Sequence, residues 1–181
     1  MQNSSAKDKV YPADTPIFTV RGFRIAILKK PAFYVTGFST FAKEDGCSIA
    51  AFLRQLREDG SLRQLQQLCR QPQQVWVCLS GNEGRADADY RCTVCVQQSE
   101  PPGCAQLLGR GLHTLYAPES EWAEFTVAPG QSPRELHSIG VYSMIAEIGY
   151  SFNGEVGFHL DNEHEWSPGG AMRFLLPVTR R

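Results

Sequence analysis

The sequence predicts an α/β (α+β) fold in which two tandem β-α-β-β modules join into one mostly antiparallel sheet, with two main helices and a central ligand cleft. Three observations carry this prediction. Strand-like runs outnumber helical ones, and both halves of the chain follow the order strand, helix, strand, loop, strand. The offset between the halves is about 80 residues, which is too long for a solenoid repeat and indicates one duplicated module.

The first half begins with two extended runs. Residues Ile17–Leu28 form the first, with Gly22 as a bulge or turn, and Pro31 separates it from the second, Ala32–Thr40. An amphipathic helix follows, because apolar side chains recur at positions i, i+3, i+4 and i+7. These side chains belong to Ile49, Phe52, Leu53 and Leu56.

A second helical piece and a strand hairpin complete the first half. The helical piece carries apolar side chains on one side, at Leu62, Leu65, Leu68 and Cys69. The strand Val75–Gly81 is apolar on both faces, so we expect it to be covered twice or to border a ligand cavity. An acidic loop then leads to Tyr90–Gln97, and the two strands suit a hairpin.

The second half repeats this order. Strand-like residues lie on both sides of Pro118, and Ser132, Pro133 and Glu135 form the capping box of a helix that ends near Gly149. A strand-like stretch, GEVGFHLDN, and a closing strand, AMRFLLPV, follow. We therefore expect Val75–Gln97 to match Glu155–Val178.

Length and charge limit the functional classes. The chain has 181 residues, a net charge of −1 and a pI of about 6.4, so no basic field recruits nucleic acid. No apolar run reaches the ~20 residues of a membrane-spanning helix. Residues 1–16 are polar and lack a signal-peptide core, so we expect a flexible leader and a cytoplasmic protein. One domain, 17–181, should follow, with pseudo-repeat halves at about 17–100 and 112–181.

Cysteine and histidine residues raise the question of a metal site. Cys92 and Cys95 form a CxxC pattern inside a strand-like run, where residues three apart point to opposite faces. His159 and His164 flank an acidic stretch, DNEHEW, without a standard ligand spacing, and a solvated hairpin loop explains them better. We expect no metal, no cofactor and reduced thiols.

The chain resembles the GyrI-like family, which includes the effector-binding domains of bacterial multidrug-sensing transcription regulators of the AraC and MerR classes. The resemblance covers about Phe23–Val178 and rests on the order and spacing of several pieces. The matching pieces are FYVTGFST, VWVCLSG with DYRCTVCV, EWAEFTVAPG, the IAEIGY helix end, GEV and MRFLLPV.

The resemblance implies a drug-sized cleft in which a buried carboxylate and aromatic rings hold lipophilic cations. Glu155 matches the family's acidic position by its distance from the final Pro-Val, although Gly154 precedes it where the family has Phe. Aromatic faces attract cations by roughly 0.5–2 kcal/mol each. The ligand-binding residues predicted in this way are Glu155, Trp76, Tyr90, Trp122, Phe125, Tyr142 and Phe158.

We therefore expect a stand-alone protein that binds a lipophilic, cationic, drug-like small molecule. About 20 polar residues precede the first strand, too few for a helix-turn-helix domain, so we expect no direct contact with nucleic acid. We expect binding rather than catalysis. Two alternatives stay open: a hydrolase of reactive genotoxic small molecules with Glu155 as general base, and a protein-interaction module such as a gyrase modulator. The oligomeric state is open between monomer and homodimer.

Overall fold

The predicted fold class is confirmed by a computed structural model, which describes residues 11–43, 47–67, 75–81, 83–101, 111–127, 136, 140–162 and 172–181. Its ten strands lie in one sheet, in which all the pairs are antiparallel. The strands are β1 (Ile17–Val20), β2 (Phe23–Lys30), β3 (Phe33–Ala42), β4 (Val75–Gly81), β5 (Tyr90–Gln98), β6 (His113–Ala117), β7 (Ser120–Val127), β8 (Tyr150–Phe152), β9 (Phe158–Asn162) and β10 (Met172–Arg180). The helices among these residues are α1 (Cys47–Glu58), α2 (Ser61–Gln67) and α5 (Val141–Glu147).

The order of strands in the sheet is arranged about a central pair. The order is β1-β2-β7-β10-β9-β4-β5-β3-β6, with β8 paired to β10. From the central β9–β4 pair, the sheet runs outwards through β10, β7 and β2 on one side and through β5, β3 and β6 on the other. The predicted hairpin β4–β5 and the β9–β10 pair are therefore neighbours in one sheet.

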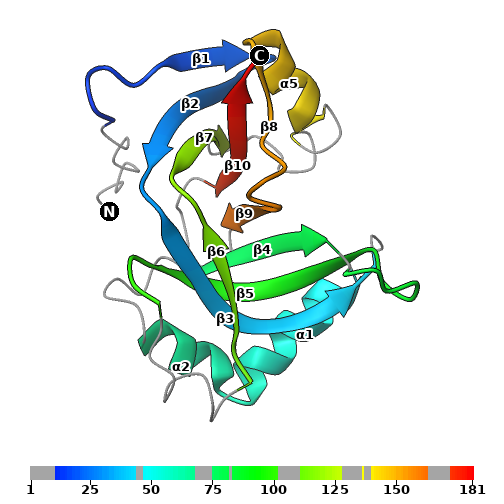
Figure 1. The fold of residues 1–181 in the computed structure, drawn as a ribbon. Helices are drawn as coiled ribbons and strands as arrows, with labels where there is room; N and C mark the ends of the chain where they lie inside the picture. Colours follow the sequence, from blue (N-terminus) through cyan, green and yellow to red (C-terminus); the bar gives the residue numbers. More distant parts are fainter. Residues whose placement is uncertain are drawn as a thin grey trace, which may run out of the picture.

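Two long, bent ribbons cross from one half to the other (Figure 1). Strands β2 and β3 are separated by two residues, as are β6 and β7. The two ribbons stay paired across these breaks, because Lys30 lies opposite Ser120 and Phe33 lies opposite Ala117. The sheet therefore curls, and its two halves face each other across a concave side.

The helices cover the outer side of the curled sheet. Helices α1 and α2 lie below β3, β4 and β5 in Figure 1, where leucines of both helices pack against valines of β4 and β5. Helix α5 covers the other half, and Met144 and Ile145 pack against β2, β7 and β10. Because side chains alternate along a strand, the residues between these core positions point to the concave side.

The concave side holds a core of its own. It gathers side chains from β3, β4, β5, β6, β7, β9 and β10 and from the turn before β9, namely Phe33, Val35, Trp76, Cys78, Cys95, Ala117, Trp122, Val156, Phe158, Leu160 and Leu175. Close strand approach explains one glycine here, since a Cβ on Gly37 would lie 1.9 Å from the carbonyl oxygen of Val94. The prediction that strand 75–81 is covered on both faces is confirmed, with Val75 and Val77 outward and Trp76 and Cys78 inward.

The local predictions are largely confirmed, with two differences. Gly22 forms a turn between β1 and β2 with a positive φ of 84°, a conformation that glycine adopts readily. The acidic position Glu155 lies in a turn ahead of β9, whereas the sequence placed it on that strand. The short strand β8 is an element that the sequence pattern did not show. The capping box at 132–135, His164, Leu68 and Cys69 lie outside the described residues.

The prediction that Cys92 and Cys95 point to opposite faces is confirmed. Cys92 packs on the outer side with Ala42 and Val77, while Cys95 packs on the concave side. Burial, with a hydrogen bond to Cys78, raises the pKa of the Cys95 thiol. Among the described residues, no three His, Cys, Asp or Glu side chains are grouped as metal ligands, and no helix is long and apolar enough to cross a membrane.

Candidate functional site

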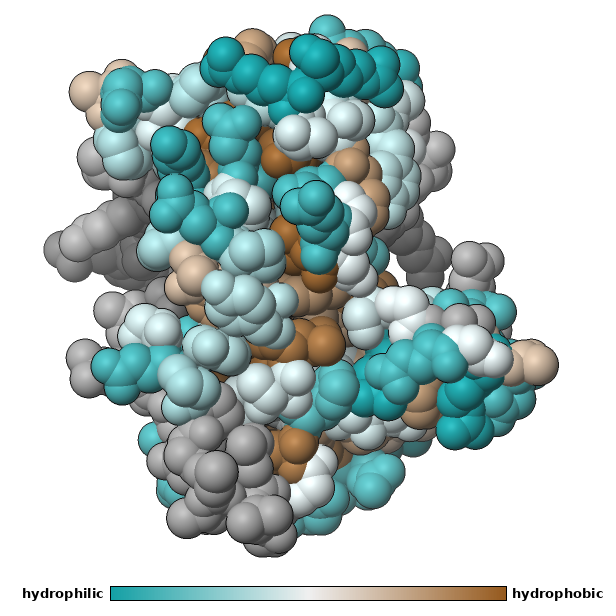
Figure 2. Space-filling view, viewed as in Figure 1, coloured by the Kyte–Doolittle hydropathy of each residue, from teal (hydrophilic) through white to brown (hydrophobic). Residues whose placement is uncertain are grey.

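A pocket of about 220 Å³ lies between the two halves, at the end of β4 and the beginnings of β5 and β9. Helix α5 and β8 close its other side. Figure 2 shows hydrophobic side chains at the surface between the upper and lower parts of the molecule, framed by hydrophilic ones. The lining residues are Leu79, Ser80, Gly81, Tyr90, Tyr142, Phe152, Gly157, Phe158 and His159.

Aromatic rings form most of this pocket. Tyr142 on α5 is 53% exposed, and its ring meets Phe152 edge-on at 5.8 Å between centroids. Phe158 is buried, and its ring lies 6.0 Å from that of Trp122 on the concave side. His159 stacks at 4.9 Å on Phe174, which belongs to the core under α5. The pocket therefore offers one exposed ring at the surface, Tyr142, and more deeply buried rings beneath it.

Among the described residues that line the pocket there is no Asp, Glu, Lys or Arg. Within the described part of the chain, no Lys or Arg lies over the rings of Tyr142, Phe152 or Phe158. The volume is below the ~300–1,000 Å³ of typical drug sites, so it suits a ligand of one or two fused rings.

The concave side forms a second aromatic region, and here the chain supplies its own cations. Trp122 lies 5.4 Å from Phe33, and the Nζ atom of Lys30 lies 4.8 Å from the Phe33 centroid and 5.8 Å from that of Trp122. Lys30 also donates a hydrogen bond of 2.9 Å to Gln97. On the other side of this region, the guanidinium of Arg173 lies 5.3 Å from the Trp76 centroid.

Glu124 is a buried carboxylate on the same side of β7 as Trp122. The hydroxyl of Tyr11 donates a 2.7 Å hydrogen bond to Oε1 of Glu124, and Oε2 lies 3.9 Å from Nη1 of Arg173. Burial, followed by this hydrogen bond, raises the pKa of Tyr11 to about 12. Residue 11 belongs to the predicted leader, so the end of that leader contacts the sheet.

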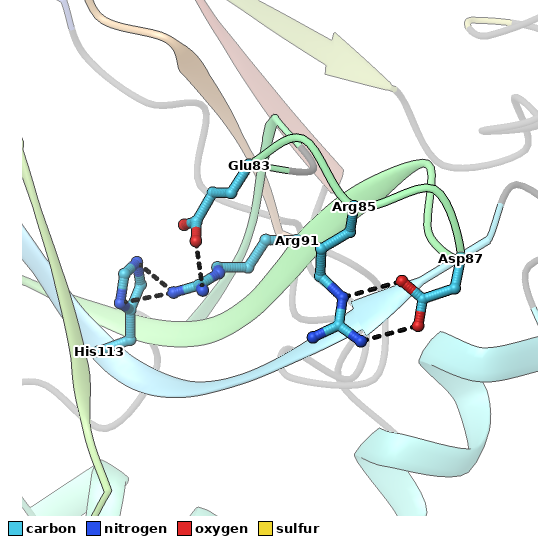
Figure 3. Close-up of polar contacts among 5 residues, drawn as sticks. All are labelled: Glu83, Arg85, Asp87, Arg91 and His113. Atoms are coloured by element: carbon cyan, nitrogen blue, oxygen red, sulfur yellow. Dashed lines mark hydrogen bonds and ion pairs between the residues drawn. The ribbon is translucent and has the colours of Figure 1, made fainter.

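A polar cluster lies farther along the concave side, around Arg91 (Figure 3). Nη1 of Arg91 lies 2.8 Å from Nδ1 and 3.1 Å from Nε2 of His113, and Nη2 donates to Glu83 at 2.8 Å. Burial, with the nearby charge of Arg91, lowers the pKa of His113. Arg91 and Arg85 both lie over the ring of Phe41, at 4.6 and 4.5 Å.

The structure distributes the seven predicted site residues over four places. Tyr90, Tyr142 and Phe158 line the pocket. Trp76 and Trp122 lie on the concave side, and Phe158 also contacts that region. Phe125 packs in the core under α5, where it meets Phe174 edge-on. Glu155 is exposed, and its backbone N–H donates to Asn153 in the turn between β8 and β9.

Sequence reasoning missed several residues of both regions. Phe152 and His159 line the pocket. Both lie within four residues of Glu155 in the sequence, and no pattern there distinguished them as site residues. On the concave side it missed Lys30, Glu124 and Arg173. The sequence does contain a signal for Glu124. In the strand EWAEFTV, Glu124 lies two residues after Trp122, so the two side chains face the same side of the sheet, and a charged residue beside a tryptophan on one face is unusual for a plain core.

Comparisons with known proteins give a fold but no family. No protein-family model matches the chain, and no curated protein sequence matches it. Among solved structures, it is similar to SAV2435 bound to tetraphenylphosphonium, with a TM-score of 0.64 and 10% identity over 86% of this chain and 93% of that one. It is also similar to a putative bacterial transcription regulation protein from Staphylococcus aureus MU50, with a TM-score of 0.58 and 9% identity over 86% and 97% of the two chains. At these identities the likeness shows a shared fold, and membership of the GyrI-like family stays a prediction.

Proposed function

We propose that this chain is a small-molecule-binding protein and that the pocket between its halves takes a flat, lipophilic cation. The observation that carries the proposal is the aromatic lining, whose rings at Tyr142, Phe152 and Phe158 hold no Lys or Arg from the described residues. A shared fold with a tetraphenylphosphonium-bound protein supports it. The hydrolase and protein-interaction alternatives stay predictions.

The expected affinity follows from this lining. None of the described lining residues is a carboxylate, so preference for a cation rests on the ring faces, which contribute about 0.5–2 kcal/mol each. A permanent cation should therefore bind more tightly than its neutral counterpart by about tenfold, rather than by the larger factor that a buried counter-ion would give.

N-methylquinolinium and 4-methylquinoline test the proposal by calorimetry at about pH 8, where 4-methylquinoline is uncharged. The two probes share a two-ring system, which suits the pocket volume of about 220 Å³. We expect saturable binding of both and a lower Kd for the cation. Tetraphenylphosphonium serves as a larger probe that requires Tyr142 to move.

Two tyrosines of equal exposure provide the variant and its control. Tyr142 in the pocket is 53% exposed, and Tyr116 on β6 is 52% exposed and pairs with Tyr34 at 5.1 Å. We expect Tyr142→Ala to weaken N-methylquinolinium binding about tenfold, since it removes a ring face and apolar contact area, and Tyr116→Ala to leave it unchanged. Absence of saturable binding, or equal effects of both variants, would overturn the proposal.

A further inference from the structure

His159 is a titratable side chain in the lining of the pocket. Its ring stacks on Phe174 at 4.9 Å between centroids, and it lies opposite Leu79 of β4 in the register of the sheet. It is partly exposed, so protons and ligands can both reach it. Imidazole is the side chain whose charge ordinarily changes between about pH 5 and pH 8. Among the described lining residues, His159 is therefore the one through which pH can change the charge of the pocket in this range.

One carboxylate shares a face of β9 with His159. Asp161 lies two residues further along the strand, so its side chain points to the same side of the sheet, and it is only 7% exposed. The register places it between Val77 of β4 and Phe174 of β10. An ionised Asp161 beside a neutral imidazole carries a charge of −1, and protonation of His159 cancels this charge. The other described side chains around His159 are apolar or aromatic and come from β4, β10, α5, β8 and β5: Leu79, Phe174, Tyr142, Phe152 and Tyr90.

We propose that His159 sets the charge specificity of the pocket: its neutral imidazole admits a flat cation and its imidazolium excludes one. This inference rests on the proposed function and adds a dependence on pH, which ring faces alone do not provide because they do not titrate. A ligand that fills about 220 Å³ touches the lining, so its charge and that of the imidazolium lie only a few ångströms apart. At such separations two like charges repel more strongly in a partly desolvated pocket than in bulk water.

Three two-ring probes of different charge test this by calorimetry between about pH 5 and pH 8. The Kd of N-methylquinolinium, a permanent cation, should rise about five- to tenfold as the pH falls through the range in which imidazole takes up its proton. N-methyl-2-quinolone is neutral throughout and should change by less than about twofold. Naphthalene-2-sulfonate is an anion throughout and should bind more tightly at the lower pH. The sign of the effect thus follows the charge of the probe.

Two histidines provide the variant and its control. His159→Gln should make N-methylquinolinium binding independent of pH, with an affinity close to that of the wild type at about pH 8. His113 on β6 lies beside Arg91 and not in the lining, so His113→Gln should keep the wild-type pH dependence. His137 and His164 lie outside the described residues and are present in both variants. A loss of pH dependence in His159→Gln alone therefore assigns it to His159.

Asp161→Asn separates the imidazole from the carboxylate behind it. A carboxylate that took up a proton in the same pH range would also weaken cation binding, because it would lose a negative charge. We expect Asp161→Asn to bind N-methylquinolinium more weakly at about pH 8 but still to show a pH dependence. If instead Asp161→Asn removes the pH dependence and His159→Gln retains it, Asp161 is the group that titrates and the proposal is wrong.

The imidazole also gives a readout in the wild-type protein, which serves if His159→Gln fails to fold without its stack on Phe174. Protonation and ligand binding affect each other reciprocally, so a tenfold ratio of affinities corresponds to about one pH unit. Saturating N-methylquinolinium should therefore lower the midpoint of the His159 Cε1–H titration in NMR spectra by about one pH unit. An unmoved midpoint, or a constant Kd with saturable binding at about pH 8, would overturn this inference and leave the proposed function standing. Absence of saturable binding at about pH 8 would overturn both.

Discussion

The pocket and the concave side of this protein differ in what already lies on their aromatic rings. In the pocket, the faces of Tyr142, Phe152 and Phe158 hold no cation from the described chain, and Tyr142 reaches solvent. On the concave side, Lys30 and Arg173 lie on the rings of Trp122 and Trp76. The two regions therefore share aromatic rings but differ in charge at the ring faces, so aromatic content alone does not predict which ligand a region would favour.

The same strands build both regions. Strands β4 and β9 pair with Ser80 opposite Phe158, and both residues line the pocket at this end of the pair. Two residues inwards, Cys78 and Leu160 are opposite each other in the concave core. Phe158 forms the wall between the regions, since it lines one and contacts Trp122 of the other. A change at this ring would affect both regions, so separate tests must use residues farther away.

Removing one ring from each region should give the largest contrast in stability. Trp122→Ala should lower the free energy of unfolding by about 3–5 kcal/mol, because it leaves a large cavity among fully buried side chains. Tyr142→Ala should cost about 1 kcal/mol, because that ring is half exposed and has one edge-on partner. Urea denaturation measures both values. Similar losses in the two variants would show that the concave side is not the tighter core.

A glycine in each region sharpens the comparison. Gly37→Ala should cost about 3 kcal/mol, since its Cβ would lie 1.9 Å from the backbone oxygen of Val94, which can move only with β5. Gly81 lines the pocket, and a Cβ there would meet nothing within 4 Å, so Gly81→Ala should cost less than about 0.5 kcal/mol. The same denaturation measurement applies. A mild Gly37→Ala variant would mean that β3 and β5 can separate.

The sequence predicts the elements better than it predicts the site. Alternation and helical spacing located the strands around Trp76 and Trp122 and the helix around Leu53 and Leu56, since burial of one face imposes these periods directly. The turn at 153–157 was misplaced on a strand, because GEVGFHLDN alternates only from Phe158 onwards.

Site residues escape such reasoning because their partners come from distant parts of the chain. Glu124 meets Tyr11, which is 113 positions away, and Lys30 meets Gln97, which is 67 positions away. No local pattern encodes these contacts, which depend on how the two ribbons bend. For the same reason the sequence could not show which predicted rings lie together: Tyr142 lines the pocket, whereas Trp76 lies on the concave side.

Alkaline pH should weaken the concave side through Tyr11. Its pKa is raised from 10.0 to about 12 in the folded protein, first by burial and then by the hydrogen bond to Glu124. The stability that this proton provides is fully present below about pH 10 and is lost as the pH rises from about 10 to 12. Denaturation of wild type and Tyr11→Phe from about pH 8 to about pH 11.5 tests this. The wild-type advantage should shrink above about pH 10, and parallel curves would show that the Tyr11 hydroxyl is not held in a buried contact with Glu124.

The smallest expected effect belongs to Glu155, whose carboxylate the sequence predicted to pair with a cationic ligand. Its carboxylate is exposed in the turn that joins Phe152 to Phe158, so it lies at the edge of the pocket rather than inside it. Exposed charge pairs contribute about 0–1 kcal/mol, so Glu155→Gln should change the Kd of N-methylquinolinium by no more than about threefold, and salt should reduce this further. Calorimetry at low and high salt measures it. A loss of tenfold or more that persists in salt would mean that the turn folds over the bound cation and buries the carboxylate, which would return Glu155 to the role that the sequence predicted.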